Sequence, residues 1–517
     1  MPEFDFDIAV IGGGAGGGTL AARCASRGRS VLLVERGSAN ISGLGNDEKS
    51  VLIDKNVYDD RLIEVDGASR RLYMGGVLGG GTAVYGGAML RPAPGDFEPG
   101  QYYGRRIDRC IWEWPIRYEE LAPYYNEAER LFSVSCDDAS SLHPLGLLSD
   151  ACRRPVLPMA RINQQMIAAG RTMGLRPFRL PLSIEADKCL MCDQCAGFPC
   201  PTGARRSAAR LILDSVRKGE SITVWPQTEA EELVRGSGSS IEGVRLRQRL
   251  TGATRLVRAR RYVLAAGAIG SPALLQRSGY RHPQLGRNYM MHFSPVAVGV
   301  FVRDTEADRN FVKQIGLSDF YFGTPSLPEK MGIIQSLPAP GPLMLAKFGL
   351  KHLPKRLLQL LRSRLLPLVG IIEDLPQPSN YVEWRGERFA NGDHSVHLHH
   401  QFSEYDRRRG AELTQQMVRI LRATGAAHCV TQVLPSREHV AHQCGTLRFG
   451  SSCEHAVVDR DCRMFDHPDV FVADGSFLPT SLGVGPSLTI IANALRVADV
   501  IMDEVSVTFS KVEELAR

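Results

Sequence analysis

Three glycines near the start of the chain have the spacing of a dinucleotide-binding motif. They form Gly12-x-Gly14-x-x-Gly17, and Glu35 follows 18 residues after the last of them. Glycine at these positions permits a tight turn, a close approach of the backbone to a pyrophosphate and close packing of a helix on a strand. A carboxylate about 20 residues further on accepts hydrogen bonds from ribose hydroxyls and disfavours a 2′-phosphate. The motif therefore predicts a dinucleotide site.

The elements that must position this motif follow from the pattern of apolar residues. Residues 8–11 form a short apolar run, residues 19–27 an alanine-rich helical stretch, and residues 31–34 a second apolar run that ends at Glu35. This order predicts a βαβ unit with the glycines at the turn between the first strand and the helix. The helix would then present its unpaired N–H groups and the positive end of its dipole to the phosphates.

Two later segments repeat the pattern of a strand followed by glycine. Residues 261–272 run from an apolar strand into Gly267, and residues 470–476 run from another strand into Asp474 and Gly475. We expect both segments to add strands to the nucleotide-binding sheet, so the chain would leave that domain after about residue 90 and again after about residue 290 and return each time. Insertions of this length are tolerated because the entropy cost of loop closure grows slowly with loop length.

Four cysteines lie within twelve residues, as Cys189-x2-Cys192-x2-Cys195-x4-Cys200-Pro201. Thiolates at such spacing can hold one soft metal centre, and the run approximates the iron–sulfur pattern C-x2-C-x2-C-x3-C-P with one extra residue before the last cysteine. The alternatives are zinc, a disulfide pair or free buried thiols. The spacing leaves a metal centre and a metal-free segment both open, with an iron–sulfur cluster as the first candidate.

Composition excludes several classes of protein. The chain has 517 residues, 44% hydrophobic and 23% charged, which is typical of two or more globular domains and not of disorder. The net charge of +6 is small and spread along the chain, so no nucleic-acid partner is indicated. Neither an apolar run of about 18 residues nor an N-terminal signal sequence is evident. We expect no integral membrane segment and a cytoplasmic location with reduced thiols.

Residues 344–372 combine leucines with lysines and arginines and are broken by two prolines. We favour a helix that packs on the protein's own core with a solvated basic face. The alternative is a flap that touches a membrane, a lipid-like substrate or a partner.

Several segments together resemble the glucose-methanol-choline (GMC) family of flavin oxidoreductases. Besides the glycine motif, they are residues 79–87 followed by Arg91-Pro92, residues 113–125, 264–272 and 286–288, and a block over residues 442–499. The resemblance implies an α/β protein, a Rossmann-like FAD-binding domain with an inserted α+β substrate domain whose antiparallel sheet is covered by helices. Residues 1–290 and 440–517 would form the discontinuous FAD-binding domain, with the cysteine-rich segment at 185–205, and residues 291–439 the substrate-binding domain.

The resemblance also implies FAD, bound in an extended pose across the N-terminal domain. Val84 stands where some sugar oxidases of the family attach the flavin through a histidine, so the FAD should be noncovalent. Pro486 would open a helix whose dipole stabilises the reduced flavin. The residues expected to line the cofactor are Gly12, Gly14, Ala15, Gly17, Glu35, Arg36, Gly80, Gly81, Thr82, Ala266, Gly267, Asp474, Gly475, Pro486, Ser487 and Leu488.

His442 is the expected catalytic base. It begins the segment His442-Gln-Cys-Gly-Thr-Leu-Arg448, which resembles the family's H-x-x-G-T-x-R, where the histidine removes the hydroxyl proton while hydride leaves the same carbon for flavin N5. A histidine suits this role because its pKa lies near neutrality. The sequence departs from the family at Gly485, where members usually carry a His or Asn that contacts the substrate oxygen. One expected hydrogen bond in the transition state is therefore missing.

Together these features predict an FAD-dependent dehydrogenase or oxidase that converts the CH–OH group of a sugar, glycoside, sterol or related alcohol to a carbonyl. Electrons would pass to O2, a quinone or a redox protein, and the four cysteines would matter to that choice if they held a cluster. An NAD-dependent or disulfide-type flavin reductase is disfavoured, because the chain has no second glycine motif and no Cys-x-x-Cys beside the first helix. Gly485 keeps open a flavin-binding electron-transfer or scaffold protein whose alcohol chemistry is lost or altered.

Overall fold

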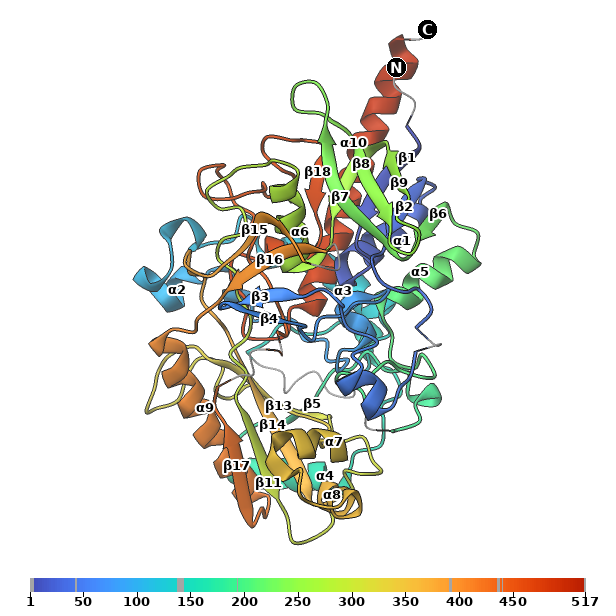
Figure 1. Ribbon diagram of the computed structural model, residues 1–517. Coiled ribbons are helices and arrows are strands. Elements are labelled where there is room, and N and C mark those ends of the chain that lie inside the picture. Colours follow the sequence, from blue (N-terminus) through green and yellow to red (C-terminus); the bar gives the residue numbers. More distant parts are fainter. Residues whose placement is uncertain are drawn as a thin grey trace.

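A computed structural model describes residues 4–41, 44–136, 144–192, 194–389, 393–434, 438 and 440–515. Two parts pack against each other, one around a parallel sheet and one around an antiparallel sheet (Figure 1). The long helix α10 (Ser487–Leu515) belongs to the first part and extends beyond it. The α/β class and the Rossmann-like sheet predicted from the sequence are confirmed.

The parallel sheet has five strands in the order β18-β10-β1-β2-β6. Its strands come from five separate stretches of sequence, which are β1 (Phe6–Ile11), β2 (Val31–Val34), β6 (Ile222–Trp225), β10 (Ala259–Leu264) and β18 (Val470–Val472). All four neighbouring pairs are parallel. β2 and β18 are buried along their whole length, as expected for a parallel sheet that is covered on both faces.

The register of this sheet brings the turns after its strands to one edge. Ile11 pairs with both Val34 and Leu264, and Leu264 pairs with Val472, so the last residues of four strands stand in one row. The glycine motif, Glu35 and the two later glycine turns follow directly after these residues. The carboxyl edge of an open parallel sheet is where such folds bind ligands.

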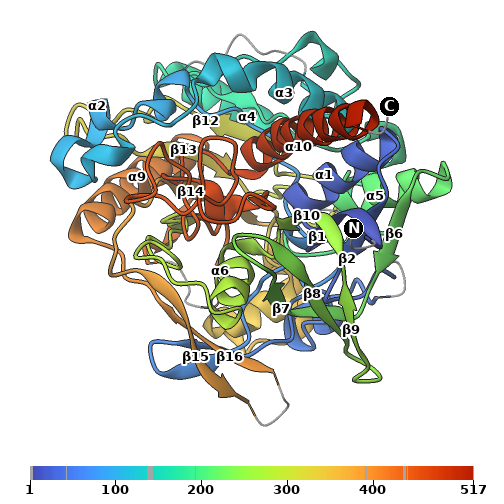
Figure 2. The ribbon, with the colours of Figure 1, turned by 90° about the horizontal axis from the view of Figure 1, so that it is seen from above.

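Helices and a small sheet cover the two faces of the parallel sheet (Figure 2). One face carries α1 (Ala15–Ser26), α3 (Tyr118–Leu131), α5 (Ala208–Arg217) and α10. α1 packs on α5 and α10, and α10 packs on α3. The other face carries α6 (Gly267–Arg277) and the antiparallel strands β7 (Thr228–Arg235), β8 (Ile241–Gln248) and β9 (Thr254–Val257). The glycine turns therefore lie between two packed layers.

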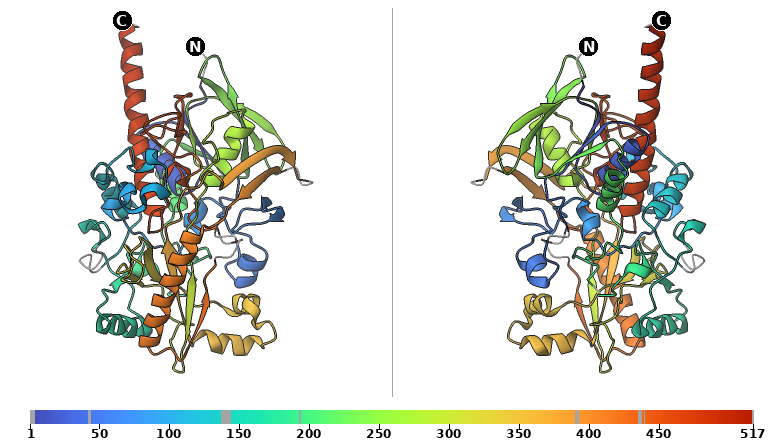
Figure 3. Two further views of the ribbon diagram at one scale, coloured as in Figure 1. Left: turned by 90° about the vertical axis from the view of Figure 1, so that its left-hand side faces the viewer. Right: turned by 90° about the vertical axis from the view of Figure 1, so that its right-hand side faces the viewer.

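The second part is built on a six-stranded sheet in the order β17-β11-β14-β13-β12-β5. Its strands are β5 (Phe178–Arg179), β11 (Val296–Val300), β12 (Ile315–Leu317), β13 (Gly332–Ser336), β14 (Leu365–Ile372) and β17 (His428–Gln432), and every pairing is antiparallel. Helix α9 (Glu404–Ala423) packs on β11 and β14 and is in turn covered by α4 (Arg161–Thr172). α7 (Pro342–Leu345) and α8 (Lys355–Arg362) lie on the other side of the sheet from α9 (Figure 3).

The packing crosses the domain limits that the sequence led us to expect. β5 and α4 belong to the second part, although they precede residue 290. A four-stranded sheet joins β15 (Tyr381–Arg388) and β16 (His394–His399) to β3 (Ile63–Val65) and β4 (Ala68–Arg70). β16 thus pairs with β3 in the N-terminal part of the chain. The division at residues 290 and 440 stays an expectation of the sequence.

The leucine-rich basic segment is not one helix. Residues 355–362 form α8, in which Leu358 is buried while Leu357 and Leu360 are exposed, and residues 365–372 form the fully buried strand β14. Within the described residues, no helix combines the length and the apolar character needed to cross a membrane.

Candidate active site

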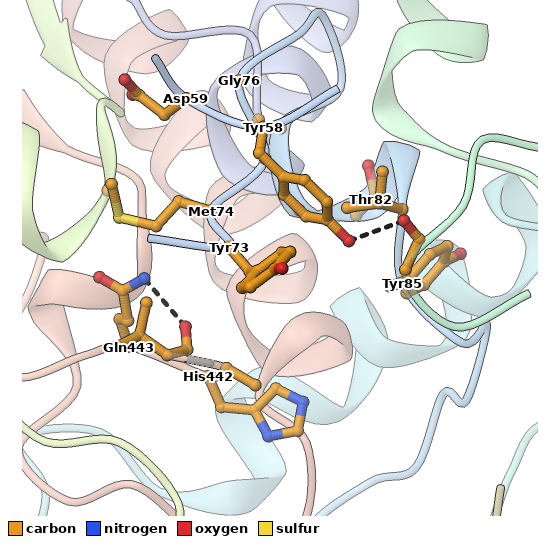
Figure 4. Close-up of a pocket in the computed structure, with 18 of the residues that line it drawn as sticks. Tyr58, Asp59, Tyr73, Met74, Gly76, Thr82, Tyr85, His442 and Gln443 are labelled. Atoms are coloured by element: carbon orange, nitrogen blue, oxygen red, sulfur yellow. Dashed lines mark hydrogen bonds between the residues drawn. The ribbon is translucent and has the colours of Figure 1, made fainter. Parts of the chain in front are cut away.

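A cavity of about 970 Å³ extends from the carboxyl edge of the parallel sheet to the antiparallel sheet of the second part. Figure 4 shows part of it, where His442 and Gln443 lie on one side and the aromatic side chains of Tyr58, Tyr73 and Tyr85 on the other. The hydroxyl of Tyr58 donates a hydrogen bond of 2.7 Å to the carbonyl of Gly197. The cavity therefore joins both parts of the molecule and has His442 in its wall.

The glycine motif forms one end of this cavity. Gly12 has a φ of +110°, and a Cβ there would lie 2.3 Å from the carbonyl oxygen of Ala265. A Cβ on Gly17 would lie 2.1 Å from the carbonyl oxygen of Gly12, so this glycine permits α1 to pack on β1. A Cβ on Gly14 would meet no atom within 4 Å, and Gly14 lines the cavity. The backbone is thus exposed to a ligand at the start of α1.

Glu35 is held rigidly at the same end. Its carboxylate accepts hydrogen bonds from the backbone N–H groups of Gly13, at 3.1 Å, and Gly37, at 2.7 Å. The side chain is 8% exposed and lines the cavity, and burial raises the pKa of the carboxyl group even though the two N–H groups oppose this. The carboxylate is therefore fixed between two turns in the cavity wall.

Arg36 also lines the cavity, but its guanidinium is already paired with carboxylates. Its guanidinium pairs with Asp59 at 3.0 Å and Asp393 at 3.2 Å, and also with Asp60. The pKa of the Asp59 carboxyl lies well below its usual range. Burial opposes this shift, but the ion pairs of Asp59 with Arg61 and Arg36 outweigh it. Arg36 therefore acts as a structural cation that fixes the cavity wall.

Asp474 ties the ends of β10 and β18 together. Its Oδ2 accepts hydrogen bonds from the N–H of Gly267, at 2.8 Å, and the hydroxyl of Ser271, at 2.5 Å. Its Oδ1 accepts from the N–H of Ser476 at 2.9 Å. Ala266, Gly267, Asp474 and Gly475 all line the cavity.

Most of the residues expected at the cofactor lie together in the cavity wall. Those present in it are Gly12, Gly14, Ala15, Glu35, Arg36, Gly80, Gly81, Thr82, Ala266, Gly267, Asp474, Gly475, Pro486 and Ser487. Gly17 and Leu488 lie outside that lining, because Gly17 faces β1 and the side chain of Leu488 is fully buried in the core. The sequence reasoning missed Gly13 and Gly16, which do line the cavity. The glycine run 12–14 and 16–18 was the available signal for both.

His442 is paired with a second histidine that the sequence gave no reason to select. Nδ1 of His442 lies 3.1 Å from Nδ1 of His292, and Nε2 of His292 lies 2.9 Å from the carbonyl oxygen of Leu482. A carbonyl only accepts, so Nε2 of His292 carries the proton and its Nδ1 is the acceptor. His442 must then carry its proton on Nδ1. Its Nε2 is left with a free lone pair.

The surroundings of His442 favour a neutral base. Burial, with smaller contributions from His292 and Lys313, holds the pKa of His442 well below 6.5, and burial lowers that of His292 to about 4. His442 has a φ of +64°, a rare conformation for a residue with a side chain. A Cβ on Gly485 would lie 3.3 Å from Nε2 of His442, so the glycine leaves the reactive nitrogen accessible.

The cysteine-rich segment contributes to the cavity through residues other than its cysteines. Gln194, Ala196, Gly197 and Phe198 line the large cavity, whereas all four cysteine side chains surround a separate cavity of about 10 Å³. Over the chain that the structure describes, no three His, Cys, Asp or Glu side chains are placed to hold a metal ion. The described residues therefore give no support for an iron–sulfur cluster.

A parallel sheet with glycine turns at its carboxyl edge, and a long cavity with a histidine in its wall, are the features expected of a dinucleotide-dependent oxidoreductase. Sequence models of the family described as GMC oxidoreductase match residues 6–294 and 376–494, and a model described as FAD binding domain matches residues 196–429. The chain belongs to the GMC oxidoreductase family, and its cofactor is FAD. The expectation from the sequence is confirmed on both points.

Two similar proteins are named as oxidases. The chain is 29% identical to 6'''-hydroxyparomomycin C oxidase of Streptomyces lividus and 30% identical to paromamine 6'-oxidase of Streptomyces fradiae, with 95% of this chain and 90% of each relative covered. Among solved structures, pyridoxine 4-oxidase from Mesorbium loti matches with a TM-score of 0.67 at 19% identity, over 96% of this chain and 99% of that one. The structural match supports the fold alone.

The described residues fit FAD. One end of the cavity suits a pyrophosphate and a ribose. The pyrophosphate would lie against the open side of Gly14 and the free N–H groups at the start of α1, and the ribose beside the fixed carboxylate of Glu35. Pro486 and Ser487, at the start of α10, line the same cavity as His442. A cofactor that reaches from the glycines to α10 would end beside the histidine.

Proposed function

We propose that this enzyme oxidises the CH–OH group of an alcohol to a carbonyl, with His442 as the general base. The observation that carries the proposal is the hydrogen-bond chain from His442 through His292 to the carbonyl of Leu482. That chain assigns the proton of His442 to Nδ1. It leaves Nε2 unprotonated in the cavity wall, where a base is needed.

The residues around the base have distinct tasks in this reaction. The substrate hydroxyl donates a hydrogen bond to Nε2 of His442, which takes the proton as the C–H bond breaks. The imidazolium formed keeps its Nδ1–H directed at His292, so the ring does not need to turn. FAD, when bound, accepts the hydride. The alcohol thus loses one proton to the protein and one hydride to the cofactor, and a carbonyl compound remains.

The cofactor-binding roles are part of the same proposal. Gly12, Gly14 and Ala15 would contact the pyrophosphate through the backbone, and Glu35 would accept hydrogen bonds from the ribose. Asp474 would hold the turn after β18 against the cofactor. The start of α10 would place its positive dipole end beside the isoalloxazine, where reduction adds negative charge.

The relatives support an alcohol of the sugar type. The two Streptomyces enzymes are named for oxidation of 6'''-hydroxyparomomycin C and paromamine. We propose a sugar, glycoside or related alcohol as substrate. The electron acceptor, either O2, a quinone or a redox protein, and the cytoplasmic location stay predictions of the sequence.

Anaerobic reduction tests the reaction without involving the acceptor. The FAD-loaded enzyme is mixed with a panel of sugars, glycosides, sterols and simple alcohols, and the loss of oxidised flavin absorbance is followed. At least one alcohol should reduce the wild type, and His442→Ala should retain FAD but reduce about 10² to 10⁴ times more slowly. Reduction of the variant at the wild-type rate would remove His442 from the mechanism.

The same assay separates the second candidate function. Bound FAD that no alcohol reduces, but that artificial electron donors do reduce, would indicate an electron-transfer or scaffold protein. Reoxidation of the reduced enzyme by O2 and by a soluble quinone, measured side by side, then tests the acceptor.

A further inference from the structure

Lys313 is a buried lysine in the wall of the same cavity as His442. It lies two residues before β12, and its side chain is 4% exposed. Its stem passes directly over Gly86, where a Cβ would lie 2.3 Å from Cε of the lysine and 3.1 Å from Nζ. Any other residue at position 86 would displace this side chain. The glycine therefore permits a lysine that reaches into the cavity.

The ammonium of Lys313 has little to neutralise it. Its Nζ donates one hydrogen bond of 3.0 Å to Oε1 of Gln335, on the neighbouring strand β13. Among the residues that the structure describes, no carboxylate forms an ion pair with it. Burial lowers the pKa of Lys313 to about 8, and the groups that act on its charge are Cys195 and, on the catalytic side, His442. At pH 7 the ammonium is therefore protonated with two N–H donors to spare.

A buried cation without an anion is costly, and such groups are normally paired. The part of the cavity lined by residues 290–440 does not supply the anion. The other charged side chains of that part are Lys355 and Arg362 on α8, and Glu48, which also lines the cavity, accepts the N–H of Leu343 with its carboxylate. Gly485 contributes no polar side chain on the side of His442. The missing partner of Lys313 is then supplied by what enters the cavity.

We propose that Lys313 selects substrates by their charge. Its ammonium binds an oxygen of the substrate, most strongly that of a carboxylate, and disfavours a substrate with an ammonium group at that place. This inference rests on the proposed function, since it concerns a second group of the alcohol that His442 deprotonates. Gln335 holds the lysine in place, and the two spare N–H groups bind the substrate oxygen. The preferred order is an alcohol with an anionic group first, then a neutral alcohol, and last an alcohol with an ammonium group.

Ligands without a hydroxyl group test the charge preference at Lys313, because they bind but cannot be oxidised as alcohols. Butyrate, butyramide and butylammonium have the same chain length and carry charges of −1, 0 and +1. Each is titrated into the FAD-loaded enzyme at pH 7 by calorimetry. We expect butyrate to bind at least tenfold more tightly than butyramide, since charged hydrogen bonds are the stronger ones, and butylammonium to bind most weakly.

Two variants and a control assign the effect to Lys313. Lys313→Met should weaken butyrate at least tenfold and leave butyramide much less affected, with FAD still bound. Lys313→Gln, which keeps a donor for Gln335, should do the same if the methionine variant is unstable. Lys351→Met is the matched control, because Lys351 is exposed and lies outside the cavity lining, and it should bind butyrate like the wild type.

The outcomes that overturn the inference are definite. Butyrate that binds no tighter than butylammonium, or not at all, contradicts it, as does equal loss of butyrate binding in the Lys313 and Lys351 variants. Failure of the proposed function looks different, because then no alcohol reduces the flavin while the preference for butyrate persists. Activity with alcohols but no preference among the three ligands would contradict the role of Lys313 and leave the proposed function intact.

Discussion

The Nδ1 atoms of His442 and His292 lie 3.1 Å apart, although the two residues are 150 positions apart in the chain. Their rings meet edge to face, with centroids 4.8 Å apart and an interplanar angle of 90°. This edge-on contact lets one ring nitrogen donate to the other. The contact with Leu482 settles the direction of donation, so the tautomer of His442 is set by a residue that does not need to touch the substrate.

Replacement of His292 by Phe should therefore slow catalysis without weakening binding. The variant removes the acceptor for the Nδ1–H of His442, which would leave a buried donor unpaired at a cost of about 1 to 3 kcal/mol. We expect kcat to fall roughly 5- to 150-fold, while the KM and the FAD content change little. Steady-state kinetics with a reducing alcohol measure this split.

His292→Asn is the control for that variant, because its Oδ1 can accept a hydrogen bond near the position of Nδ1. It should recover part of the lost kcat. Equal kcat in the Phe and Asn variants, or a loss expressed only in KM, would mean that His292 has a packing role and does not position the base.

The low pKa of His292 also predicts a loss of stability in acid. Burial lowers its pKa from 6.5 to about 4 in the folded protein, so below pH 6.5 the unfolded chain binds a proton that the folded chain does not. The contribution of His292 to the free energy of unfolding is therefore highest above pH 6.5 and decreases by about 3 kcal/mol as the pH falls to 4. The thermal midpoint should therefore drop more steeply between pH 7 and pH 5 in the wild type than in His292→Phe. Parallel curves for the two proteins would contradict the assignment.

Local patterns in the sequence were sufficient for the nucleotide-binding end of the molecule. The apolar runs at 8–11 and 31–34 with glycines between them have one simple arrangement, because a βαβ unit must turn tightly where its helix begins. The later segments at 261–272 and 470–476 carry the same signal, and the register of the sheet places their turns beside the first. Convergence of these turns on one cavity follows from parallel pairing.

The substrate end could not be predicted in this way. Lys313 and His292 belong to no motif, and their positions depend on packing between distant segments, as the contact of Lys313 with Gly86 illustrates. β5 and β3 pair with strands that come much later in the chain, since Arg179 pairs with Ile315 and Ile63 with Val396. Edge pairings of this kind are decided by the whole fold and not by the local sequence. The cysteine spacing left a metal centre and a metal-free segment both open, and the described residues give no support for a cluster.

Two neighbouring glycines should separate FAD binding from folding. A Cβ on Gly14 would meet no protein atom, whereas a Cβ on Gly16 would lie 1.5 Å from the carbonyl oxygen of Ala473. Gly14→Ala should therefore fold normally but bind FAD at least tenfold more weakly, because its methyl group occupies the space where the backbone meets the pyrophosphate. Gly16→Ala should lower the yield of folded protein, since α1 must move away from β18.

The flavin-to-protein ratio and the thermal midpoint with excess FAD measure the two effects. Tight FAD binding by Gly14→Ala would show that the cofactor does not approach the motif as proposed. A stable Gly16→Ala protein would show that α1 has more freedom than its packing indicates.

Substitution at Gly485 should impair the enzyme even where it introduces the residue that other members of the family carry. A Cβ there would lie 3.3 Å from Nε2 and 3.4 Å from Cε1 of His442, tighter than an ordinary contact. The imidazole has little room to yield, because its backbone has a φ of +64° and His292 holds its other nitrogen. Gly485→Ala should therefore lower kcat/KM about tenfold by crowding the base, and Gly485→Asn should lower it further, with FAD content and thermal midpoint near those of the wild type. Higher activity in the Asn variant would mean instead that the site lacks a polar group on this side and that His442 can move to accommodate one.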